Sequence, residues 1–318
     1  MRDALTVIGI DIGGTRVKAA LVDEAGKVLA SGQTATPASV DRVRSELGAM
    51  LNDLQKDRPR VMAVGIGCKG IIDAASTEVL TLPGTLHHLE GQRLAELVSG
   101  ALPPGCPITA DNDARVAMAG ERVWGAARNC EDALLLTLGT GVGGAVLSGG
   151  RILQGAKGIA GHIGHLTVDS DGADCICGNR GCLETVFSAR AIESEAYAAV
   201  HRGMASKLVG CGATPSCEQV FACARNGDPV ARRIVERATK VLGAAIAGLL
   251  FVIDPEVVIL SGQIVESLDI LLDRLRSEVE WRTKPLLRRT VRLVKSELVD
   301  PSGVLGAAAL AQTLLARQ

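Results

Sequence analysis

Three cysteines and a histidine lie close together in residues 161–184, and these are residue types that bind metal ions. Cys175, Cys177 and Cys182 supply three thiols within eight positions, and His165 can supply an imidazole. Such a donor set is typical of a tetrahedral, structural zinc ion that is closed to solvent chemistry. The alternative is three free, buried thiols. We favour the zinc site, in which the metal staples the loop and does not act as the catalyst.

Two short glycine-rich turns, each between two apolar runs, have the composition of phosphate-binding turns. They are Gly13-Gly14-Thr15 and Gly139-Thr140-Gly141. Glycine lets successive backbone N–H groups approach an anion closely, and the two threonines add hydroxyl donors. Asp11, just before the first turn, can hold a Mg²⁺ ion that bridges phosphate oxygens. Neither turn is a Walker motif, but two such turns, one preceded by an acid, indicate a phosphate site.

Asn112 and Asp113 lie in the run ADNDAR, between a predicted strand and a predicted helix. Asn and Asp at such a position commonly cap the helix, and the motif alone favours that role. Asp111, the third polar residue of the run, receives no chemical role from the sequence.

The elements that must position these residues alternate between strands and helices. Apolar, β-branched runs predict strands, and apolar residues that recur every three or four positions predict helices. The predicted strands are residues 7–12, 17–22, 28–34, 61–66, 108–110, 133–138, 142–147, 257–260 and 291–294. The predicted helices are residues 37–55, 94–98, 114–123, 188–200, 229–250 and 303–315; the stretch 241–253 is interpreted as a buried helix running into a strand. This alternation predicts an α/β architecture.

The segments IGIDIGGTRVKAAL and LLLTLGTGVGGAVL share one design, which is a strand, a glycine-rich turn and a second strand. Such self-similarity predicts a chain built from two related halves, with two unrelated hairpins as the alternative. No linker or low-complexity segment is evident, so we expect two domains that pack closely around a cleft.

Composition and charge argue against several classes of protein. The 318 residues are 47% hydrophobic but only 2% aromatic, so the core must be aliphatic. A net charge of −1 gives no global field that would attract nucleic acid or a membrane, and the apolar stretch 241–253 is too short to span a bilayer. Nine cysteines, six of them scattered, fit a reducing cytoplasm better than a disulfide scaffold. No secretory signal is expected at the N-terminus.

Five motifs occur in order along nearly the whole chain: IGIDIGGTRVKAALVD, DNDARVAMAGE, LGTGVGGAV, GIAGHIGH and CICGNRGCLE. Together they resemble the ROK family of sugar kinases and sugar-responsive repressors, within the actin-like ATPase superfamily. The resemblance implies an actin-like, ribonuclease H-like α/β fold with two domains around a cleft. We expect a small N-terminal domain of residues 1–110 and 303–318, and a large C-terminal domain of residues 111–302 that carries the zinc site.

The resemblance also implies roles for single residues. Asp113 matches the catalytic base, which accepts the proton of the sugar's primary hydroxyl as that oxygen attacks the γ-phosphorus of ATP. The residues expected to bind the sugar are Asn112, Asp113, His162, His165, Glu184 and Gly70. The residues expected to bind ATP and Mg²⁺ are Asp11, Gly13, Gly14, Thr15, Gly139, Thr140, Gly141 and Gly262. The family's zinc ligands map onto His165, Cys175, Cys177 and Cys182, where Zn²⁺ would shape the sugar pocket by fixing His165 and Glu184.

The choice of sugar depends on positions where this chain departs from the family. The family usually has glutamate at the position of His162, and histidine occurs there in some N-acetylmannosamine kinases. Residues 67–70 and 81–91, which should add sugar contacts, also differ from the family pattern. We expect an ATP-dependent hexose kinase that acts on the 6-hydroxyl of an aldohexose, glucose being the commonest substrate. N-acetylmannosamine or another N-acyl hexosamine is the alternative substrate, and polyphosphate stays open as a donor.

The alternative of another class is a sugar-responsive transcriptional repressor. Repressors of the family carry an additional N-terminal helix-turn-helix, for which a first strand near residue 5 leaves no room, and the chain lacks a basic recognition segment. A non-catalytic binding module would not need Asp11, both turns and Asp113 together. We therefore expect sugar and ATP as partners, no nucleic acid or membrane, and, by resemblance, a cytoplasmic homodimer.

Overall fold

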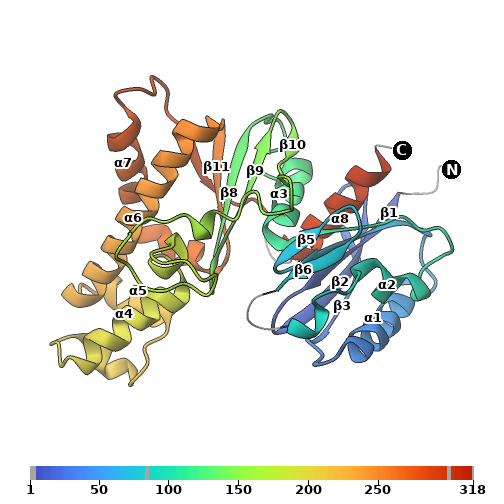
Figure 1. Ribbon diagram of the computed structural model, residues 1–318, viewed down its shortest axis with the longest axis horizontal. Coiled ribbons are helices and arrows are strands. Elements are labelled where there is room, and N and C mark those ends of the chain that lie inside the picture. The colour runs from blue at the N-terminus through green and yellow to red at the C-terminus, as the bar shows by residue number, and fades with distance from the viewer. Residues whose placement is uncertain (1–4, 83–85, 299–301, 317–318) are drawn as a thin grey trace. The chain divides into compact units, whose positions relative to one another are not determined.

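The computed structural model describes residues 5–82, 86–298 and 302–316. The chain forms two compact units: the first takes residues 1–130, 151–160 and 296–318, and the second takes residues 131–150 and 161–295. Each unit has its own sheet with helices packed against it (Figure 1), which confirms the predicted α/β class. The predicted domain boundaries stay a prediction, and the helix after residue 112 lies in the first unit.

The first unit contains a five-stranded sheet whose strands lie in the order β3-β2-β1-β4-β7. The strands are β1 (Thr6–Ile12), β2 (Arg16–Asp23), β3 (Val28–Ala35), β4 (Val61–Cys68) and β7 (Ile108–Asn112). The first three form the predicted antiparallel meander, and β4 and β7 run parallel to β1. A separate hairpin of β5 (Ile71–Asp73) and β6 (Glu78–Thr81) lies outside the predicted strands.

Helices cover both faces of this first sheet. They are α1 (Val40–Gln55), α2 (Leu94–Val98), α3 (Asp113–Trp124) and α8 (Ser302–Leu315), with 3₁₀ turns η1 (His87–Leu89) and η2 (Ser99–Ala101). Ile8, Ile10 and Ile12 pack in one core with the buried residues of α1 and α2, whereas Val7 packs in another core with α8. This division follows from the geometry of a strand, in which successive side chains point to opposite faces.

α8 approaches the sheet closely because two strand residues lack a side chain. A Cβ atom on Gly9 would lie 2.0 Å from the carbonyl oxygen of Val304, and one on Gly65 would lie 1.8 Å from the carbonyl oxygen of Ala307. Glycine in a strand interior often marks such a close backbone approach. These two glycines therefore set how α8 packs against β1 and β4.

The second unit repeats the strand design of the first. Its strands include β8 (Ala133–Leu138), β9 (Val142–Ser148), β11 (Val257–Ser261) and β12 (Arg292–Lys295), in the order β9-β8-β11-β12. β8 and β9 form an antiparallel hairpin, and β11 and β12 run parallel to β8, just as β4 and β7 run parallel to β1. The predicted strand–turn–strand design is therefore confirmed in both halves. The short strand β10 (Arg151–Ile152) belongs to residues 151–160 of the first unit.

The helices of the second unit enclose one aliphatic core that also holds Phe187 and Phe221. They are α4 (Ala189–His201), α5 (Cys217–Arg225), α6 (Pro229–Ile253) and α7 (Leu272–Thr283), with 3₁₀ turns η3 (Ile163–His165), η4 (Leu183–Thr185), η5 (Lys207–Cys211) and η6 (Gln263–Ile270). The interpretation of residues 241–253 as a helix running into a strand was wrong. α6 continues to Ile253 and ends at Asp254, whose φ of 49° is left-handed, before β11 begins.

Across the described part of the chain, every helix is either too short or too polar to cross a bilayer.

Candidate functional site

Three neighbouring strands of the first unit end at the same edge of the sheet, and polar residues stand at those ends. In the pairing of β1 with β4, Asp11 lies opposite Gly67; in the pairing of β4 with β7, Gly67 lies opposite Asp111 and Cys68 lies opposite Asn112. The carboxyl ends of parallel strands are where α/β sheets bind ligands. The register therefore gathers Asp11 and the ADNDAR run at one place.

The strand pairing places Asp11 and Asp113 near Cys68, because Cys68 lies opposite Ile12 of β1 and opposite Asn112 of β7. Burial raises the pKa of the Cys68 thiol, and the negative charges of Asp113 and Asp11 raise it further. Asp11 is half-buried at the end of β1, whereas Asp113 is exposed in the first turn of α3. The structure thus brings the predicted magnesium ligand and the predicted base close to one buried thiol.

Asn112 is both a helix cap and a link to the predicted sugar-binding loop. Its side-chain oxygen accepts a hydrogen bond from the backbone N–H of Ala114 at 3.0 Å, so the capping interpretation is confirmed. Its side-chain amide donates to the carbonyl oxygen of Gly70 at 2.8 Å. Gly70 has a φ of +92°, and a Cβ atom there would lie 2.3 Å from the carbonyl oxygen of Thr81. The turn therefore requires glycine, and it joins two of the predicted sugar contacts.

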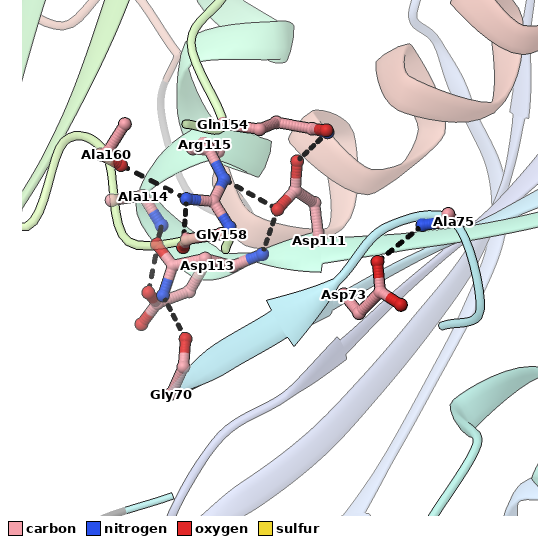
Figure 2. A network of polar contacts seen from close by, with 11 residues as sticks. Gly70, Asp73, Ala75, Asp111, Asp113, Ala114, Arg115, Gln154, Gly158 and Ala160 are labelled. Atoms are coloured by element: carbon pink, nitrogen blue, oxygen red, sulfur yellow. Dashed lines mark hydrogen bonds and ion pairs between the residues drawn. The ribbon is translucent and has the colours of Figure 1, made fainter. Parts of the chain in front are cut away.

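A buried ion pair joins Asp111 and Arg115, on either side of Asn112 and Asp113 in the chain, and the sequence predicted no role for it. Figure 2 shows the guanidinium of Arg115 bonded to the carboxylate of Asp111, with Nε and Oδ1 2.6 Å apart. Arg115 also donates through Nη1 to the carbonyl oxygens of Gly158 and Ala160, at 2.9 and 3.1 Å. Because Asp111 lies near the end of β7 and Arg115 lies in the first turn of α3, neither strand nor helix periodicity signals this pair.

The first glycine turn connects β1 to β2 at the end of Asp11's strand. The backbone N–H of Gly13 donates to the carbonyl oxygen of Arg16 at 3.0 Å, and the hydroxyl of Thr36 donates to the carbonyl oxygen of Gly13 at 2.6 Å. Gly14 and Thr15 are exposed at the tip of the turn. The turn is therefore fixed at its base, and its tip is accessible to an anion.

The second glycine turn connects β8 to β9 in the second unit. Gly139 accepts the backbone N–H of Ala189, at the start of α4, at 2.9 Å, and Thr140 is exposed. Gly262, at the end of β11, has a φ of +99°, and a Cβ atom there would lie 2.4 Å from the carbonyl oxygen of Leu138. Four of the predicted nucleotide residues therefore lie at the end of β8: Gly139, Thr140, Gly141 and Gly262.

The carboxylate of Glu184 lies against the same turn. Its Oε2 accepts a hydrogen bond from the backbone N–H of Val142 at 2.9 Å, and a Cβ atom on Gly141 would lie 2.3 Å from that oxygen. Glu184 follows Cys182 by two positions in 3₁₀ turn η4. The loop that carries the cysteines is thus joined to the glycine turn by one hydrogen bond.

Four donor atoms in the second unit can hold a metal ion. The ligand atoms of His165, Cys175, Cys177 and Cys182 all lie within 4.8 Å of one another. Cys177 Sγ and Cys182 Sγ are 3.7 Å apart, and Cys175 Sγ and His165 Nδ1 are 3.6 Å apart. A tetrahedral zinc ion with ordinary bond lengths separates two sulfurs by about 3.8 Å and a sulfur from a nitrogen by about 3.6 Å. The donor set and its spacing therefore fit zinc.

His162 lies beside this cluster. Its ring stacks on that of His165, with ring centroids 6.5 Å apart and an angle of 15° between the planes. His162 is half-buried. Of the predicted loop 81–91, residues 83–85 lie outside the described residues; His87 is exposed, and His88 is half-buried.

Known proteins resemble this chain over almost its full length. The model of the ROK family matches residues 7–314. A glucokinase from Thermotoga maritima is 35% identical over 311 residues, which cover 96% of this chain and 97% of that protein. An N-acetylmannosamine kinase from Shigella flexneri is 33% identical over 318 residues, covering 97% of this chain and 99% of that protein.

A solved structure extends the likeness to three dimensions. It is a ROK family glucokinase from Streptomyces griseus in complex with glucose and AMPPNP, with a TM-score of 0.81 and 31% identity. The alignment covers 97% of this chain and 99% of that one. The predicted resemblance and the predicted actin-like α/β fold are therefore confirmed. On its motifs, its fold and these matches, the chain belongs to the ROK family.

Proposed function

We propose that this protein is an ATP-dependent sugar kinase that transfers the γ-phosphoryl group of ATP to the 6-hydroxyl of an aldohexose. The observation that carries the proposal is that Asp11 and Asp113 both lie near Cys68, where β1, β4 and β7 end. One carboxylate can hold the metal of a metal–nucleotide, and the other can accept a proton. Phosphoryl transfer needs this combination of positioning and charge neutralisation.

In the proposed reaction, Asp113 accepts the proton of the sugar hydroxyl as its oxygen bonds to the γ-phosphorus. The bond from that phosphorus to the β–γ bridging oxygen breaks, and ADP and a sugar 6-phosphate result. Asp113 is exposed at the beginning of α3, where a substrate can reach it. Asp11 would hold Mg²⁺, directly or through water, and turns 13–15 and 139–141 with Gly262 would contact the nucleotide.

Glucose is the first candidate substrate, because the relatives from Thermotoga maritima and Streptomyces griseus are glucokinases. N-acetylmannosamine is the second, and two observations favour it. His162 stands where glutamate is usual and stacks on His165, and the Shigella flexneri relative is an N-acetylmannosamine kinase. The proposed sugar contacts are Asn112, Asp113, Gly70, His162, His165 and Glu184.

We also propose that His165, Cys175, Cys177 and Cys182 bind a structural zinc ion, as their spacing fits. The ion would close a loop in which burial, together with the neighbouring thiols of Cys175 and Cys177, raises the pKa of Cys182 to about 12. Zinc would fix the position of His165 and of Glu184 two residues after the last ligand. By resemblance we further propose a cytoplasmic homodimer with no nucleic-acid or membrane partner.

A coupled assay of ADP release tests the function. Purified protein with ATP and Mg²⁺ is given glucose, mannose, N-acetylglucosamine, N-acetylmannosamine or fructose in turn, and 6-deoxyglucose serves as the control without the attacking hydroxyl. ADP release that requires the sugar, together with a 6-phosphate product by nuclear magnetic resonance, supports the proposal. ADP release that is the same with 6-deoxyglucose, or none with any sugar, contradicts it. Replacing ATP by polyphosphate in parallel tests the donor.

A further inference from the structure

We propose that Arg115 and Asp111 are positioning residues for Asp113: their buried ion pair fixes the beginning of α3 and fastens residues 158–160 to it. This inference rests on the proposed function, because it assumes that Asp113 is the base. It adds two residues to the site, neither of which contacts the reacting atoms in the scheme above. Asp113 lies between them in the chain, at the point where β7 becomes α3.

The ion pair is almost completely shielded from water. The side chains of Arg115 and Asp111 are 1% and 4% exposed, and Nε and Oδ1 are 2.6 Å apart. By contrast, Asp113 between them is exposed. The strand–helix junction therefore holds a buried ion pair next to an exposed carboxylate, that of Asp113.

Each partner of the pair makes further bonds in a different direction. Asp111 accepts the backbone N–H of Asn112 at 2.7 Å and the side-chain amide of Gln154 at 3.2 Å. Arg115 donates through Nη1 to the carbonyl oxygens of Gly158 and Ala160. In Figure 2, Asp111 and Arg115 come from the strand–helix junction, and their partners Gln154, Gly158 and Ala160 come from a later segment of the chain. The pair thus ties the junction to a segment about forty residues later.

Stability alone does not explain this arrangement. Burying two charges is costly, and a buried ion pair often adds no more stability than apolar residues of similar volume. Nη2 of Arg115 is in addition a buried donor that has no partner among the described residues, which adds a further cost. What the pair does supply is a unique conformation of the turn that carries Asp113.

The expected effect is on the rate of the chemical step. A general base must lie within hydrogen-bond reach of the proton that it accepts, and a displacement of about 1 Å can lower the rate about 100-fold. Loss of Arg115 should therefore lower kcat about 10- to 100-fold. KM for ATP should change much less, because neither residue is proposed to bind the nucleotide.

The test compares Arg115→Met, Arg115→Lys and the double variant Asp111→Val/Arg115→Met with the wild type. The control is Arg44→Ala, which removes an exposed ion pair with Asp41 in the same unit. The double variant replaces both charges by apolar groups, so we expect it to fold with a Tm near that of the wild type. It should nevertheless lose kcat as Arg115→Met does. Arg115→Lys keeps the charge and should recover part of the rate.

Trypsin cleavage gives a second, local readout. Lys157 is exposed and lies in the segment whose carbonyl groups Arg115 binds. Cleavage after Lys157 should be faster in Arg115→Met and in the double variant, and unchanged in Arg44→Ala. If a folded double variant keeps wild-type kcat while the wild type is active, the positioning role is wrong and the proposed function stands. If the wild type phosphorylates no sugar, both fail.

Discussion

Oε2 of Glu184 accepts the backbone N–H of Val142 at 2.9 Å, which joins the cysteine loop to the glycine turn between β8 and β9. Gly141 makes this contact possible, because a Cβ atom there would lie 2.3 Å from the same oxygen. Any ion that fixes the cysteine loop would therefore also fix the turn proposed to contact the nucleotide.

Gly141→Ala is accordingly expected to push the Glu184 carboxylate away and to break its bond to Val142. The loss should destabilise the protein by about 1.5–3 kcal/mol, the range for a hydrogen bond to a charged group. Gly139→Ala is the matched control, because a Cβ atom at Gly139 meets nothing within 4 Å. Urea unfolding of both variants checks the prediction; equal midpoints would contradict it.

Metal analysis tests the cysteine cluster. The purified protein should hold about one zinc ion per chain, the content of a single structural site. Cys177→Ser should lose the metal and lower Tm, whereas Cys106→Ser, which removes a half-buried thiol of the first unit, should retain it. Because thiols must lose their protons to bind zinc, the metal should be released on acidification. A protein with no zinc and an unchanged Tm after chelation would rule out the site.

Because α8 packs closely against the sheet at Gly9, we expect a substitution of Gly9 to lower the stability of the protein strongly. Gly9→Ala places a methyl group 2.0 Å from the carbonyl oxygen of Val304, so α8 must shift. Overpacking of this kind typically costs about 1–3 kcal/mol. Gly48→Ala, within α1, meets only a side-chain atom at 4.0 Å and should stabilise that helix by up to about 1 kcal/mol. In thermal unfolding, Tm should therefore fall for Gly9→Ala and rise for Gly48→Ala.

Asp228 caps α6, and its lowered pKa predicts that the stability of the protein depends on pH. Burial disfavours its charge, but bonds from the backbone N–H groups of Ala231 and Lys207 outweigh that effect and lower the pKa of this carboxyl. A lowered folded-state pKa adds stability that is present above the unfolded value of about 3.9 and is lost as the pH falls through the folded value. The wild type should exceed Asp228→Asn in stability at pH 7, and the difference should shrink below about pH 4. A difference that is constant from pH 7 to pH 3 would contradict this.

Much of the fold could be predicted because it depends on local pattern. The bounds of α2 and β8 are those predicted, and the others lie within a few residues, since apolar periodicity reports which side chains face a core. α5, α7, β10 and the β5–β6 hairpin have no counterpart among the predicted ranges. Of these, α5, β10 and the hairpin are short elements, which carry weak periodicity. The error at residues 241–253 has a similar origin, because an all-apolar run does not distinguish helix from strand.

The sequence predicted which residues belong to the candidate site, but it did not predict which of them contact one another. The metal cluster was found because its four donors lie within 18 consecutive residues. The Arg115 network was not found, because its carbonyl partners lie 43 and 45 positions further along the chain. Contacts across such distances depend on how the chain folds back, which no local pattern reports. For the same reason, the bond between Glu184 and Val142 required the structure.

The most direct test of the account is turnover by Asp113→Asn with ATP and a hexose that the wild type phosphorylates. The variant keeps the shape of the side chain but cannot accept the proton, so kcat should fall at least about 100-fold. Sugar binding, measured by calorimetry on the same sample, should change by no more than a few-fold. Near-normal turnover by this variant would show that Asp113 is not the base and would contradict the account.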